Sequence, residues 1–276
     1  MIYPNKSEHF LKFFRKYNHG VLKKQFHTVF VDGSVPKISL APDETAPILV
    51  ILNHTSWWDM LLAIALEERM TGWNAFAAMD SRQLRRYRFF TKLGVIGVDR
   101  TTLSGAKEFV DYAATLLNDR RNSLWITPQG RFVSTDRPVA FQPGIGHIAS
   151  KLGTFYTVCI AFDYEFWDDK KPEGFISIGD LKRYENNGTL DKKEFVLEQS
   201  CEMDRLQKRL NKLKCARDPS LFQPFLISKS GVHPVYDAVR AIVSRLKGNR
   251  FHAAHGDVLT PGWNEDSSKP SAEIRL

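Results

Sequence analysis

Short apolar runs alternate with amphipathic stretches through the middle of the chain. Residues 47–52 form a β-branched apolar run, which is typical of a strand buried on both faces. Similar runs, each predicting a strand, occupy residues 73–79, 94–100, 123–127, 155–162 and 175–178. Helical periodicity is found in residues 60–66, 81–93, 101–118, 141–152 and 192–214. This alternation predicts the α/β fold class, with a mixed, largely parallel central sheet that is flanked by helices.

The N-terminal stretch, residues 6–30, predicts a basic amphipathic helix. Apolar residues recur there at spacings of three and four, with basic residues between them, and the pattern allows a break near residues 18–20. Such a helix either lies in a membrane interface, with its lysines toward anionic headgroups, or packs on its own domain, and the pattern leaves both interpretations open. If it binds the membrane, deleting the chain up to Phe26 should release the protein from anionic liposomes and leave it folded.

The length of 276 residues and the apolar content of 43% allow one large domain with a sizeable core. We expect an N-terminal amphipathic helical segment and link at residues 1–46 and the α/β core at 47–180. A helical part of the same domain, with a helix at 235–246, is expected at 181–255. The tail at 256–276 is rich in proline, serine and charge, and is expected to be loose.

The net charge indicates the class of partner, and the cysteine content indicates the cellular setting. A formal charge of +8 favours anionic partners: nucleic acid, an acidic membrane surface or phosphorylated substrates. The three cysteines are odd in number and lack metal-ligand spacing, which predicts a reduced setting and no metal site. No apolar run approaches the roughly 18 residues of a membrane-spanning helix, and the N-terminus lacks the apolar core of a signal peptide. We expect a cytoplasmic protein that is peripheral on the inner face of the membrane.

A candidate catalytic pair follows the first apolar run. On a regular helix, His54 and Asp59 would lie roughly 140° apart and would not touch. If His54 instead precedes a helix whose first turn holds Asp59, with Ser56 and Asp59 spaced as in a capping box, the loop can bring the imidazole onto the carboxylate. The carboxylate then orients the ring, and the other ring nitrogen can act as a general base on a hydroxyl. The structural alternative is a helix cap beside an ordinary loop histidine, because so short a pattern recurs by chance.

Four stretches at the expected strand ends occur in the right order to form one site. They are Asn53-His54 with Asp59, Asp99-Arg100, residues 127–131 (Thr-Pro-Gln-Gly-Arg), and residues 141–144 (Phe-Gln-Pro-Gly) with Ala149. Together they resemble the motifs of the glycerolipid acyltransferase family, the PlsC-like group that includes bacterial 1-acylglycerol-3-phosphate acyltransferases. Those motifs are Asn-His-x4-Asp, an apolar strand ending in Asp-Arg, Phe-Pro-Glu-Gly-Thr-Arg, and Phe-Lys-x-Gly followed by Ala. The resemblance covers about residues 48–163.

The resemblance implies an enzyme of phospholipid biosynthesis that transfers a fatty acyl group from a thioester donor to a hydroxyl of a lipid acceptor. His54, oriented by Asp59, would deprotonate the acceptor, which attacks acyl-CoA or acyl carrier protein directly, so that no cofactor is implied beyond this co-substrate. Arg100 and Arg131 would bind an anionic headgroup or the donor's phosphates, and backbone amides around Gly130 would stabilise the oxyanion. The implied substrate-binding residues are Arg100, Gln129, Gly130, Arg131, Gln142 and Gly144.

Three positions depart from the family pattern. Gln129 stands in place of a glutamate, Gln142 in place of a lysine, and Arg131 in place of a threonine, so that the arginine comes one residue early. Two ionic groups of the usual acceptor site are therefore neutral. This weakens the case for a glycerol phosphate acceptor more than it weakens acyl transfer, and it leaves a glycolipid, an ornithine-type lipid or a carotenoid glycoside open.

Other interpretations compete with acyl transfer. One is a thioester hydrolase in which His54 acts on water, although the sequence has no Gly-x-Ser-x-Gly nucleophile elbow. Another is a catalytically altered family member that binds lipid. The arginines between Arg82 and Arg88 suggest a nucleic-acid-binding protein, but nothing resembles a nucleic-acid-binding module, so we expect no nucleic acid partner. His147, in the expected helix near the site, is expected to be an ordinary satisfied or exposed histidine.

Overall fold

The computed structural model describes residues 1–33, 46–69, 73–167 and 169–228. Its strands are β1 (Thr28–Asp32), β2 (Ile48–Leu52), β3 (Asn74–Asp80), β4 (Val95–Val98), β5 (Asn122–Ile126), β6 (Thr154–Glu165), β7 (Glu173–Ile178), β8 (Lys182–Glu185) and β9 (Phe222–Ile227). Its helices are α1 (Glu8–Gln25), α2 (Asp59–Glu67), α3 (Ser81–Arg86), η2 (Arg88–Leu93), α4 (Leu103–Leu116), α5 (Gly144–Ala149), α6 (Lys192–Cys215) and η3 (Pro219–Leu221). All of these elements belong to one compact unit. The expected helix at 235–246 and the tail at 256–276 lie outside the described residues.

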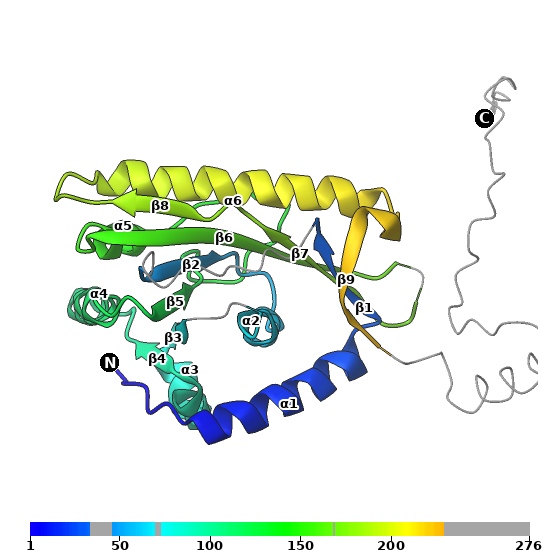
Figure 1. Ribbon diagram of the computed structural model, residues 1–276, viewed down its shortest axis with the longest axis horizontal. Helices are drawn as coiled ribbons and strands as arrows, with labels where there is room; N and C mark the ends of the chain where they lie inside the picture. The colour runs from blue at the N-terminus through cyan, green and yellow to red at the C-terminus, as the bar shows by residue number, and fades with distance from the viewer. Residues whose placement is uncertain (34–45, 70–72, 168, 229–276) are drawn as a thin grey trace, which may run out of the picture. The chain divides into compact units, whose positions relative to one another are not determined.

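Parallel strands form the centre of the sheet, in the order β4-β3-β5-β2-β6 (Figure 1). The sheet continues with β7, which is antiparallel to β6, then with β1, which is parallel to β7, and with β9, which is antiparallel to β1. β8 pairs with β6 in antiparallel orientation. The predicted α/β fold with a mixed, largely parallel sheet is therefore confirmed. The carboxyl ends of β2, β4 and β5 lie at one edge of this sheet, which is where open α/β sheets usually bind ligands.

Helices cover both faces of the sheet (Figure 1). Side chains alternate along a strand, so Ile48 and Val50 of β2 enter a core with residues of α1, α2 and α3. Leu49 and Ile51 enter a second core with residues of α4, α5 and α6. Because both faces of β2 are buried, the run is apolar at every position, as the sequence indicated.

The N-terminal helix packs on its own domain. α1 runs through residues 18–20 without the break that the pattern allowed. Asn18 is fully buried, and its side-chain amide donates to the carbonyl of Leu61 in α2 at 2.8 Å. Leu22 and Phe26 are also fully buried. Deleting the chain up to Phe26 would therefore remove part of the core, and would not test membrane binding alone.

Three stretches differ from the predicted elements. Residues 28–30 belong to β1 instead of the N-terminal helix, because this stretch pairs with β7 on one side and β9 on the other. The expected helix at residues 81–93 is divided into α3 and η2 at Tyr87, whose backbone (φ −118°, ψ 57°) is not helical. β8 and β9 lie in the part that was expected to be helical, at 181–255.

None of the described helices combines the length and the apolar character that a membrane span requires.

Candidate active site

A buried asparagine fixes the end of β2. The Asn53 side chain is fully buried, and its Nδ2 donates to the carbonyl of Phe162 in β6 while its Oδ1 accepts from the Phe162 amide, each at 2.8 Å. The two bonds reproduce a step of the β2–β6 ladder beyond the last residue of β2. The following residue, His54, is thereby held at the carboxyl edge of the parallel strands.

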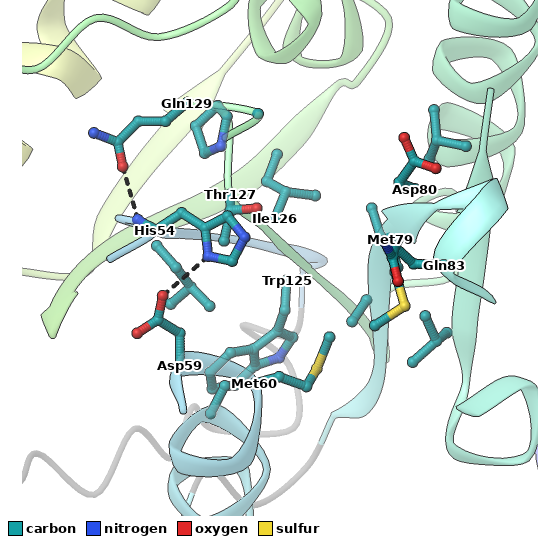
Figure 2. A pocket seen from close by; sticks show the side chains of 18 of the residues that line it. His54, Asp59, Met60, Met79, Asp80, Gln83, Trp125, Ile126, Thr127 and Gln129 are labelled. Carbon is teal, nitrogen blue, oxygen red and sulfur yellow. Dashed lines mark hydrogen bonds and ion pairs between the residues drawn. The ribbon is translucent and has the colours of Figure 1, made fainter. Parts of the chain in front are cut away.

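His54 contacts Asp59 in the arrangement that the spacing allowed. His54 precedes α2, and Asp59 is the first residue of that helix. The Nδ1 atom of His54 lies 3.0 Å from Oδ2 of Asp59 (Figure 2). The Asp59 side chain is 2% exposed and that of His54 is 28% exposed. With Nδ1 directed at the carboxylate, Nε2 is the ring nitrogen left to meet a substrate.

Several donors hold the Asp59 carboxylate in place. Its Oδ2 accepts from the backbone amides of Thr55 at 2.8 Å and Ser56 at 3.0 Å, and its Oδ1 accepts from the Tyr164 hydroxyl at 2.7 Å. Only half of the expected capping box forms, because the Ser56 hydroxyl accepts from the Trp58 amide instead of that of Asp59. Burial, and then the charge of Asp59, raise the pKa of the Tyr164 phenol well above its ordinary value, so this hydroxyl remains a donor.

The turn after β5 fixes the His54 backbone. Oε1 of Gln129 accepts from the His54 amide at 2.7 Å, and Figure 2 shows this contact on the side of His54 opposite the cleft. The Val133 amide donates to the His54 carbonyl, also at 2.7 Å. Gln129 is 5% exposed, so its side chain is part of the wall of the site. The Gln129 carbonyl oxygen thus positions the histidine, a contact that a glutamate oxygen would also make.

Gly130 and Arg100 are joined across the mouth of the site. Gly130 has a positive φ of 68°, and its carbonyl accepts from Nη1 of Arg100. The Arg100 Nε atom lies 3.7 Å from Oδ2 of Asp80. The Gly130 amide donates to the Thr127 carbonyl at 3.0 Å, so it is engaged within the turn. Of the backbone amides around Gly130 that were expected to stabilise an oxyanion, that of Gly130 itself is therefore already bonded.

The remaining motif lies beside this turn. The Gln142 amide donates to the Pro128 carbonyl at 2.9 Å, which brings the loop before α5 next to the turn after β5. His147, on α5, is exposed, as expected. The structure brings all of the predicted site residues to the wall of one cleft, namely His54, Asp59, Arg100, Gln129, Gly130, Arg131, Gln142 and Gly144.

The cleft is large and mainly apolar. Its volume is about 1580 Å³, and it extends from His54 between α2, α3, β3 and β5 (Figure 2). Small side chains on β3 leave this space open, among them Ala75 and Ala77. At the start of β3, Lys6 reaches the cleft, and its Nζ donates to the Ala75 carbonyl at 3.1 Å. Apolar residues that line this part are Leu11, Met60, Ala63, Ile64, Met79, Phe90, Leu93, Val95 and Trp125.

Two residues of the site were not predicted from the sequence. Tyr164 lies in β6, just after the apolar run at 155–162, and only the fold shows that it reaches Asp59. Phe132 directly follows the third motif, and its ring centroid lies 4.2 Å from that of the His54 imidazole. The Phe132 side chain is 58% exposed. The position of Phe132 directly after the third motif could have indicated that it belongs to the site. The sequence alone does not show that its ring contacts the imidazole.

A comparison with models of protein families agrees with the motifs. A family model described as Acyltransferase matches residues 30–162. A comparison with curated proteins gives no match. Among solved structures, the chain is similar to the crystal structure of the 1-acyl-sn-glycerophosphate (LPA) acyltransferase PlsC from Thermotoga maritima. The sequence identity is 16% and the TM-score is 0.48, and the match covers 74% of this chain and 80% of that chain. The acyltransferase family model thus matches the part of the chain that holds the four motifs.

Proposed function

We propose that this protein transfers a fatty acyl group from acyl-CoA or acyl carrier protein to a hydroxyl of a lipid acceptor. The observation that carries the proposal is the His54–Asp59 pair at the wall of an apolar cleft, within an acyltransferase-family domain. A buried carboxylate fixes the imidazole tautomer and stabilises the imidazolium that forms during the reaction. The apolar cleft offers room for the acyl chain of a substrate.

The reaction proceeds by direct transfer. Nε2 of His54 takes the proton of the acceptor hydroxyl as its oxygen attacks the thioester carbonyl carbon. The tetrahedral intermediate then collapses, the carbon–sulfur bond breaks, and the leaving thiolate takes the proton back from His54. The products are an ester and a free thiol, and His54 returns to its neutral form. The donors from Thr55, Ser56 and Tyr164 hold the Asp59 carboxylate against the imidazole throughout.

Release of free thiol from palmitoyl-CoA tests this function. The assay is run with and without a panel of lysophospholipids and glycolipids. We expect release that needs both an acceptor and His54. Release that needs His54 but no acceptor would favour the thioester hydrolase. If neither palmitoyl-CoA nor palmitoyl-acyl carrier protein releases a thiol, a lipid-binding family member without turnover is favoured.

The alanines of β3 make the length of the accepted acyl chain testable. We expect Ala77→Phe to fill the cleft and to lower kcat/KM for palmitoyl-CoA while octanoyl-CoA is little affected. Each methylene that loses its buried position costs about fourfold in affinity. Chain-length profiles of the two enzymes measure the effect. Ala216→Phe, at an exposed position after α6, is the matched control and should leave the profile unchanged. An unaltered profile in Ala77→Phe would contradict the placement of the chain.

We propose that the protein binds the membrane surface through α1 and η2. Phe13 and Tyr17 of α1 and Phe89 of η2 are 66%, 58% and 40% exposed. They are joined by ring contacts through Phe10 and Phe14, with centroid distances between 5.8 and 6.4 Å. Exposed cations lie on the same two helices and on α3: Lys12, Lys16, Arg85, Arg86, Arg88 and Lys92. Aromatic side chains beside basic ones suit the interface of an anionic bilayer, which supports a peripheral protein on the inner face of the membrane.

Substitution of the exposed rings tests this surface without removing the core. Phe13→Ser with Phe89→Ser should lower binding to anionic vesicles by about tenfold or more, since both rings lose their place in the interface. Sedimentation with vesicles measures it, and added salt should weaken the wild-type binding. Phe166→Ser, at a position that is 61% exposed, is the matched control. Equal binding by the control and the double variant would contradict the proposal.

A further inference from the structure

The surroundings of His54 suit an uncharged headgroup, and this inference rests on the proposed function. The third and fourth motifs give the cleft two amides and an aromatic ring: Gln129, which binds the His54 backbone, Gln142 in the cleft wall, and Phe132, whose ring lies beside the imidazole. Phe132 stands at the position of the arginine in the motif Phe-Pro-Glu-Gly-Thr-Arg. Where the motif has a cation beside the base, this chain therefore presents the face of an apolar ring.

Two of the arginines that line the cleft are bonded to protein groups. Among the described residues that line the cleft, the cations are Lys6, Arg82, Arg100 and Arg131. Arg100 bonds to the Gly130 carbonyl and lies 3.7 Å from Asp80, and Arg82 donates to the same carboxylate at 3.3 Å. The single charge of Asp80 thus offsets part of the charge of the two guanidinium groups. A phosphate placed there would meet this carboxylate, which repels it.

The other cations are placed differently. Lys6 reaches the cleft at the start of β3, at the sheet edge opposite His54. Arg131 is exposed at the mouth and makes no ion pair with another described residue. Such a free guanidinium suits the phosphates of the donor's carrier group, which remain outside the apolar cleft.

We propose that the acceptor is a lipid with an uncharged, ring-shaped polyhydroxyl headgroup, of the sugar class. The apolar C–H face of such a ring packs on the exposed face of Phe132, at the side of the imidazole. The amide of Gln142, exposed in the cleft, can donate to and accept from hydroxyls. One hydroxyl of the ring then lies beside Nε2 of His54. A phosphate in the same place would lose hydration against the apolar face of Phe132.

A binding measurement separates this inference from the proposed function. Calorimetry on the full chain compares octyl glucoside with octyl phosphate, both below the concentration at which they form micelles. We expect the glucoside to bind at least about tenfold more tightly. Phe132→Arg should remove or reverse this preference, whereas Leu197→Arg, which adds the same charge at a position 64% exposed on α6, should not. Equal affinity for the two compounds, or a preference for the phosphate, would overturn the inference.

Turnover completes the test. Wild type should acylate an alkyl glucoside faster than lysophosphatidic acid at matched chain length, and Phe132→Arg should shift the ratio of the two kcat/KM values toward lysophosphatidic acid by about tenfold or more. Arg131→Gln should raise the KM for acyl-CoA and leave the acceptor ratio unchanged. Preferred binding of the glucoside without any acylation would overturn the proposed function and leave the headgroup preference standing. Faster acylation of lysophosphatidic acid by wild type would overturn the headgroup inference alone.

Discussion

Replacing His54 with alanine is expected to lower kcat/KM by about 10²–10⁴-fold, the usual contribution of a positioned general base. The loss arises because nothing else in the site takes the acceptor proton at that point. The imidazole lies at the wall of the cleft with Nδ1 committed to Asp59, so alanine removes the base and leaves the cleft open. Thiol release from palmitoyl-CoA in the presence of acceptor measures the effect.

A surface variant makes this prediction specific. His147→Ala removes an exposed histidine of α5 and should leave kcat/KM within twofold of wild type, roughly as for other surface substitutions. A His54→Ala enzyme with wild-type turnover would remove the base from the mechanism.

Asp59→Asn is expected to have the second largest effect, a loss of about 10²–10⁴-fold in kcat, which acts through the tautomer and orientation of the histidine. An asparagine amide also places N–H groups against the donors of Thr55, Ser56 and Tyr164, which now bond to the carboxylate. We therefore expect a loss of stability of about 1–3 kcal/mol. Thermal unfolding measures the stability, and assays below the lowered melting temperature measure the kinetics.

Graded variants separate the chemistry of Asp59 from its role in the fold. Tyr164→Phe removes one donor and keeps the carboxylate, so its loss of activity should be smaller than that of Asp59→Asn. Asp111→Asn changes a carboxylate that is 48% exposed and paired with Lys151, and it should change neither activity nor stability appreciably. If Asp59→Asn lowers the melting temperature but retains wild-type kcat, the carboxylate is only a structural group.

The sequence predicted what depends on neighbours along the chain. The contact between His54 and Asp59 follows from a strand, a short loop and the first turn of a helix, all within one stretch. The buried strands were also predicted from short stretches of sequence. A strand such as β2, which lies between β5 and β6 with both faces buried, is apolar at every position. The order of the motifs then indicated that the loops after these strands share one edge of the sheet.

The features that the sequence did not predict depend on contacts between residues that are far apart in the sequence. Residues 28–30 of β1 were predicted to be the end of the N-terminal helix, and only the pairing with β7 and β9 decides that they form a strand. The bond from the His54 amide to Gln129 joins residues on two different strand ends, so Gln129 was expected to bind substrate and not to position the histidine. The size of the cleft depends on how α2 and α3 pack around β3, which no local pattern encodes.

Acyl transfer itself is tested most directly by identifying the product. Palmitoyl-CoA and a lipid acceptor are incubated with wild type and with His54→Ala, and mass spectrometry measures acylated acceptor and free palmitate beside the released thiol. We predict acylated acceptor in amounts equal to the thiol with wild type, and neither above background with His54→Ala. Free palmitate in place of the ester, or equal ester formation by both enzymes, would contradict a His54-dependent acyltransferase.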